Sequence, residues 1–143
     1  MRRDQRGTAV IEFVWLTILL LVPLVYIVLT VFETQRTAYA TSAAARSAGR
    51  ALLTAPDEAS ARPRAHAAAR MAFEDQVTDA PMNLQISCRP EPTHCLTPGN
   101  TVTVAVVSRA ALPLIPSFLG DNVPSIRVES SHSAPYGAFR EQR

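Results

Sequence analysis

The sequence predicts an α+β fold: a long N-terminal transmembrane helix that extends outward, a second helix, and a small antiparallel sheet of about three strands. Three observations predict it. Twenty residues near the N-terminus carry no charge, an alanine-rich stretch follows them, and three short runs of alternating polarity close the chain. We divide the chain into a basic leader (1–7), a long helix (8–55) with a membrane span at 13–32, and an α+β domain (56–143).

The overall composition limits the protein to one ordinary domain outside its apolar segment. The chain has 143 residues and a formal net charge of +2. That charge is too small for the basic surface of a nucleic-acid-binding protein, and no basic stripe is present. We therefore expect no nucleic-acid partner.

The apolar segment Phe13–Phe32 has the length and composition of a membrane helix. Fifteen of its twenty residues are Leu, Ile, Val or Phe. At 1.5 Å per residue a helix of this length spans about 30 Å, the thickness of a bilayer's hydrocarbon core. Thr17 and Thr30 can bond back to the helix backbone, and membrane helices tolerate a proline such as Pro23.

The charges at the two ends of the span predict its orientation. Arg2, Arg3 and Arg6 precede it, whereas Glu33 and then Arg36 follow. The positive-inside rule places the N-terminus in the cytoplasm and the C-terminal domain outside it. We expect a single-pass protein of the cell membrane with the lipid bilayer as its first partner.

A cleavable secretory signal is the alternative interpretation of the same segment. Ala38-Tyr39-Ala40 has the small residues of a signal-peptidase site. However, the apolar region of a signal typically has about 7–15 residues, and this one is longer.

Two helices are expected beyond the membrane. The first continues outward as an alanine-rich rod that nothing breaks until Gly49. Its alanines either offer a slim surface to another backbone or simply favour helix, and the sequence does not decide between these. The second helix follows Pro56 and runs to about Val77, with Thr54 as its expected N-cap, and Pro63 should interrupt it. Its apolar side chains are Ala67, Ala68, Met71, Ala72 and Val77.

Three strands are expected at Asn83–Cys88, Thr101–Ala110 and Ser125–Ser133, because each contains alternating apolar and polar residues. Pro98-Gly99-Asn100 provides a turn before the second strand. The apolar stretch Leu112–Gly120 contains prolines and is expected to be a packed loop.

The two cysteines, Cys88 and Cys95, lie close together between the first two expected strands. In an oxidising compartment they are expected to form a disulfide. The alternative is a metal site with His94, which would need a further ligand such as His66 or His132.

The chain lacks the sequence motifs of common enzymes. It has no nucleophile elbow, phosphate-binding glycine loop, dinucleotide fingerprint or zinc-protease motif. We therefore expect no catalytic residues, cofactor, bound metal or small-molecule substrate.

The segment Arg6–Phe13 at the inner edge of the span carries the most specific pattern. A short basic leader ends in Gly7, and Glu12 and Phe13 follow after four residues. This resembles the processing motif of type IV pilins, which prepilin peptidase cuts after the glycine. The resemblance implies cleavage between Gly7 and Thr8. The simpler interpretation is that Glu12 is the first polar residue outside the lipid, stabilised by the positive end of the helix dipole.

Over a longer stretch the protein resembles TadE-like proteins, the pseudopilins of the Tad (Flp) pilus assembly system. The similarity is strongest over residues 6–49 and looser from Ile126 to Arg140. Phe13 departs from the Tyr that usually follows this Glu in major Flp pilins, and the chain is much longer than a major pilin.

The resemblance implies a minor pilin-like subunit of a pilus assembly or type II-like secretion system. Its implied partners are prepilin peptidase, other pilins or pseudopilins, and the inner-membrane assembly platform. Gly7 and Thr8 form the implied processing site, and Glu12 serves subunit assembly. The alternative is a membrane-anchored structural or binding domain with no role in a pilus.

Overall fold

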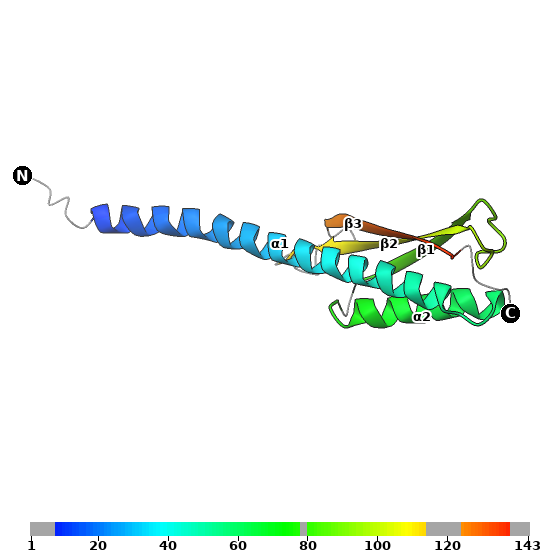
Figure 1. Ribbon diagram of the computed structural model, residues 1–143. Coiled ribbons are helices and arrows are strands. Elements are labelled where there is room, and N and C mark those ends of the chain that lie inside the picture. Colours follow the sequence, from blue (N-terminus) through cyan, green and yellow to red (C-terminus); the bar gives the residue numbers. More distant parts are fainter. Residues whose placement is uncertain (1–7, 78–79, 114–123, 138–143) are drawn as a thin grey trace, which may run out of the picture.

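The computed structural model describes residues 8–77, 80–113 and 124–137. Two helices, α1 (Thr8–Leu53) and α2 (Glu58–Glu74), precede three strands: β1 (Met82–Arg89), β2 (Thr101–Ala111) and β3 (Ser125–Pro135). Figure 1 shows α1 as a long rod with α2 and the sheet gathered around its C-terminal half. This is the α+β fold that the sequence predicts. Most of the expected loop at residues 112–120 lies outside the described residues.

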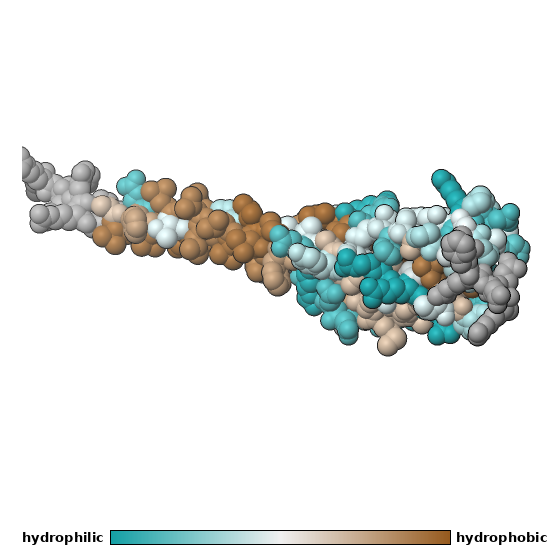
Figure 2. Space-filling view, in the orientation of Figure 1, coloured by the Kyte–Doolittle hydropathy of each residue, from teal (hydrophilic) through white to brown (hydrophobic). Residues whose placement is uncertain are grey.

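The rod α1 consists of two halves with different surroundings. From Ala9 to Phe32 its side chains are exposed apart from the half-buried Tyr26 and Thr30, and the helix continues through Pro23. From Thr37 onward one face is buried against the domain. Figure 2 shows the apolar surface concentrated on the projecting half. Gly49, the expected breaking point, lies inside the helix, which ends four residues later at Leu53.

Helix α2 begins later than the expected N-cap and is not interrupted. Its N-cap is Asp57, whose carboxylate accepts a hydrogen bond of 2.8 Å from the backbone N–H of Ser60. The prediction of Thr54 was wrong, because its hydroxyl donates to the Arg50 carbonyl and closes α1 instead. Pro63 is the sixth residue of α2, and the helix continues through it, so the expected interruption was also wrong.

The sheet is antiparallel with β2 in the centre and the order β1-β2-β3. Met82 pairs with Ser108, which pairs with Val128, and the register continues unbroken along both ladders. One face points toward the helices and contains the buried Val102, Val104 and Val106. The strands follow the expected boundaries to within two residues at each end.

The core lies where the C-terminal half of α1 meets α2 and the sheet. Small side chains dominate both helix faces, and the fully buried ones are Ala40, Ala44, Ala45, Ala48, Ala61, Ala65 and Ala69. Alanine lets the helix backbones approach closely, and Leu52 and Phe73 fill the larger spaces. The alanine face of the rod is therefore used inside the chain, a choice that the sequence left open.

The buried face of α2 differs from the apolar side chains that the sequence offers. Ala61, Ala65, Ala69 and Phe73 are buried, spaced four residues apart, whereas Met71 is 72% exposed. Alanines occur on several sides of this helix, so only Phe73 distinguishes the buried face from the others.

Candidate functional site

The projecting half of α1 is the most unusual surface of the protein. Its large apolar side chains are exposed on every side; Val10 is 64% exposed and Phe32 is 65% exposed. A helix that is apolar all round belongs either in a protein core or in a membrane. The rest of the described chain does not cover this half, so the described residues provide no core for it.

The length and polarity of this segment fit a bilayer. Within the described ranges, α1 is the one helix long and apolar enough to cross a membrane. The hydroxyls of Thr17 and Thr30 donate to the carbonyls of Phe13 and Tyr26, each at 2.8 Å. These bonds satisfy the two hydroxyl groups without water, as the sequence predicts. The segment can therefore lie in lipid with both of these threonine hydroxyls paired.

Glu12 is the carboxylate nearest to the apolar segment on its N-terminal side. It occupies the fifth position of α1, and its side chain is exposed. Across the ranges 8–77, 80–113 and 124–137 it forms no ion pair. A carboxylate at this position, one turn into the helix, is free to meet a group from another molecule.

The expected processing bond lies at the start of α1. The helix begins at Thr8, the residue after that bond, whereas Gly7 lies outside the described residues. The geometry of the leader itself is not part of the described structure.

At the C-terminal end of the apolar segment, Glu33 and Arg36 form an ion pair of 3.9 Å between partly exposed side chains. Such a pair contributes little to stability, because water screens it. One turn later Thr37 is buried, and the helix enters the domain. The change from exposed to buried residues within one turn separates the apolar segment from the folded domain.

A disulfide joins Cys88 and Cys95, as their spacing predicts, with 5.3 Å between the Cα atoms. Both cysteines are buried. Glu58, at the start of α2, accepts hydrogen bonds from the backbone N–H groups of Cys95 and Leu96 at 3.0 and 2.9 Å. The disulfide loop is thus attached to the helical layer. Because both thiols are used, they are not available to a metal together with His94.

Asn100 organises the same loop and was not identified from the sequence. Its side chain is 1% exposed; it accepts from the N–H of Glu91 and donates to the carbonyls of Glu91 and His94. Gly99 beside it has a φ of 90°, which favours glycine. The turn signal Pro98-Gly99-Asn100 indicated a bend there, but not that the amide would bridge the loop.

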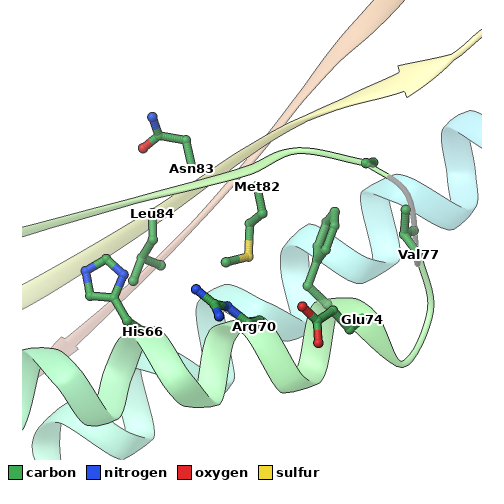
Figure 3. Close-up of a pocket in the computed structure, with 9 residues that line it drawn as sticks. His66, Arg70, Glu74, Val77, Met82, Asn83 and Leu84 are labelled. Atoms are coloured by element: carbon green, nitrogen blue, oxygen red, sulfur yellow. The ribbon is translucent and has the colours of Figure 1, made fainter.

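An open groove of about 370 Å³ lies between α2 and β1. Figure 3 shows Met82 and Leu84 pointing from β1 toward α2, while Asn83 points away. Phe73 and Val77 also line the groove, and His66, Arg70 and Glu74 follow one side of α2. Among the described residues no group of three or more His, Cys, Asp or Glu is placed to hold a metal.

Comparison with known proteins adds no relative: neither a protein family, nor a curated protein, nor a solved structure matches this chain. The function is therefore inferred from the sequence and from the geometry of the chain.

Proposed function

We propose that this chain is a membrane-anchored, pilin-like minor subunit of a pilus assembly or type II-like secretion system. One observation carries the proposal: half of a single helix is built into a folded domain, while the other half is apolar on all sides and begins beside a lone carboxylate. A subunit of this shape can be held by the bilayer and then transferred into an assembly through the same helix.

The bilayer is the solvent that the projecting half requires. Soluble monomers rarely expose apolar patches larger than a few hundred Å². Here the exposed apolar side chains continue from Val10 to Phe32. On insertion scales the Leu, Ile, Val and Phe of the span favour lipid by about 0.3–0.6 kcal/mol each. We therefore place this segment in the cell membrane, with the leader in the cytoplasm and the domain outside.

The packing of α1 argues against cleavage at the secretory-signal site. That cut would fall after Ala40, in the middle of α1, between two residues that are fully buried. It would remove Thr37 and Ala40 from the core and start the chain at the buried Thr41, which bonds to Ser130 at 3.1 Å. Cleavage after Gly7 leaves the whole of α1 in place.

Cleavage after Gly7 would create a partner for Glu12. The new α-amine of Thr8 is largely protonated at neutral pH. If the amine of one subunit lay about 4 Å from the Glu12 carboxylate of its neighbour, the attraction would be about 4 kcal/mol before desolvation costs, at an effective dielectric near 20. The cut would also remove three Arg and one Asp, so the formal charge would fall from +2 to zero.

The Glu12→Ala variant separates this role from that of a simple anchor. We expect it to insert into the membrane as wild type does but to disappear from the assembled fraction, because no other described carboxylate is available at that end. Glu33→Ala is the matched control, since it removes a carboxylate from the outer end of the same span. Membrane flotation and co-fractionation with the fibre measure the two properties.

Normal assembly of Glu12→Ala would contradict the proposal. It would favour the alternative, a single-pass anchored structural or binding domain in which Gly7 and Glu12 have no role.

A further inference from the structure

Both edges of the sheet are open in the described part of the chain. The strand order leaves β1 and β3 each with one neighbour, and β3 extends over eleven residues without a bulge in its register. An edge strand of this length presents a row of unpaired backbone groups, which soluble proteins usually protect. The two edges run in the same direction, because each is antiparallel to β2.

We propose that neighbouring membrane-anchored copies associate through these edges, with β3 of one copy adding as a parallel strand to β1 of the next. The proposal rests on the proposed membrane anchoring, which gives all copies the same orientation and height. An interface between two different edges is heterologous, so each added copy offers a free edge to the next, and copies held at one orientation by the membrane would join into a row.

The common height fixes which residues would meet. Within one sheet, Met82, Ser108 and Val128 lie at the same level, because they pair in the register. With the strands along the membrane normal, a neighbour anchored at the same depth brings its Val128 level with Met82. Its Ile126, two residues earlier, comes level with Ala80.

The groove between α2 and β1 lies at that level and on the correct face. Its apolar lining includes Phe73, Val77 and Met82. Among the described residues of the domain, Ile126 is one of the few large apolar side chains that are exposed, at 39%, and it lies on the helix-facing side because it pairs with the buried Ala110. The apolar side chains of one edge and the groove beside the other edge are thus complementary.

The outer face of the sheet is complementary as well. At the same heights Asn83 would lie beside Glu129 of the next copy, and Gln85 beside Ser131. These are amide donors against a carboxylate and a hydroxyl, and all four side chains are exposed in one copy. Pairs of this kind stabilise adjacent strands.

Photo-crosslinking of the full chain in its own membrane tests the proposal. With benzoylphenylalanine in place of Asn83, we expect a covalent dimer of this chain whose crosslink maps by mass spectrometry to β3, near Glu129. The matched control carries the probe at Ala105 in the central strand. It should give about tenfold less dimer, because β1 and β3 of the same copy already lie on both sides of this position. A crosslink to another protein, to another element, or none at all would overturn the proposal.

Two further variants, measured with the probe at Gln85, separate pairing from folding. Ile126→Asp should reduce the dimer about tenfold or more, whereas Ile126→Val should change it little. Asn83→Glu should reduce it about two- to fivefold by facing Glu129 of the next copy, and adding Glu129→Gln should restore it. An undiminished dimer in Ile126→Asp, or the absence of rescue, would contradict the register.

Flotation and loss of the leader are measured on the same samples. They distinguish a failure of the edge pairing from a failure of the proposed membrane anchoring. A protein that floats and is processed but gives no β3 crosslink refutes only the edge pairing. A protein that does not float refutes the proposed anchoring and, with it, the shared orientation on which the pairing depends.

Discussion

The amide of Asn100 shows how one buried side chain can hold a loop that contains no regular structure. Its oxygen and nitrogen bond to Glu91 and His94 on the opposite side of the loop, and its own backbone carbonyl accepts from Tyr136 at 2.7 Å. Through its side chain and its backbone carbonyl together, Asn100 thereby links the disulfide loop to the residue that follows β3.

Replacing Asn100 with Ala should lower the free energy of unfolding by about 2–4 kcal/mol, because three hydrogen bonds to a buried amide are lost. Chemical denaturation of the full chain in detergent micelles measures this. Asn83→Ala, at an exposed position, is the control and should change stability by less than about 0.5 kcal/mol. Equal effects of the two substitutions would show that the buried amide has no special role.

Asp57 gives the start of α2 a defined dependence on pH. The hydrogen bond from the Ser60 backbone N–H lowers the pKa of this carboxyl below its ordinary value of 3.8. Because the folded-state pKa is the lower one, the stabilisation is present above pH 3.8 and is lost as the pH falls through the folded-state value.

The variant Asp57→Asn keeps a capping side chain but cannot titrate there. We expect the stability difference between wild type and Asp57→Asn to be constant well above pH 3.8 and to shift against wild type below it. Unfolding curves recorded across this range test the expectation. A difference that stays constant down to the lowest pH would show that the cap does not act through its charge.

The contact between α1 and β3 depends on Gly49, which lies inside α1 without interrupting the helix. A Cβ on Gly49 would lie 3.0 Å from Cδ2 of His132, so the absence of a side chain lets the imidazole pack against the helix. Glycine inside a helix costs about 1 kcal/mol relative to alanine. The close packing of β3 against α1 offsets this cost in helix propensity.

A double-mutant cycle measures the contact. With His132 present, Gly49→Ala should give little stabilisation or a loss, because the imidazole must move. In a His132→Ala background the same substitution should stabilise by up to about 1 kcal/mol, the gain in helix propensity. If Gly49→Ala has the same effect in both backgrounds, the two residues are not coupled.

The elements could be predicted from local patterns, whereas several contacts between them could not. Alternation identified all three strands, and uncharged length identified the projecting half of α1. The N-cap of α2 was missed because Thr54 and Asp57 both carry capping side chains, and only the end of α1 decides between them. Asn100 and Glu58 were missed because their partners are backbone groups, which leave no trace in the sequence.

In the molecule as a whole, the two halves of the single helix α1 have different surroundings. Up to Phe32 the exposed side chains of α1 are those of a membrane segment, and from Thr37 onward one face belongs to the core of a domain. With the apolar half in a bilayer, as proposed, the domain cannot move far from the membrane, since α1 is one continuous helix from the apolar half into the domain. Any force applied to the apolar half is transmitted through the same helix to the domain.

This construction explains why the position of a proteolytic cut carries so much information. A cut after Gly7 leaves α1 complete and frees an amine near Glu12, whereas a cut after Ala40 divides the helix within its packed region. No cut at all keeps the basic leader, with three Arg, which the proposed orientation places at the cytoplasmic surface. The three interpretations of the segment thus predict three different N-termini.

The N-terminus of the chain purified from cells with an active prepilin peptidase, read by intact mass and N-terminal sequencing, decides among them. We predict a chain that begins at Thr8 and lacks residues 1–7. A chain that retains Met1, or one that begins at Thr41, would contradict the account.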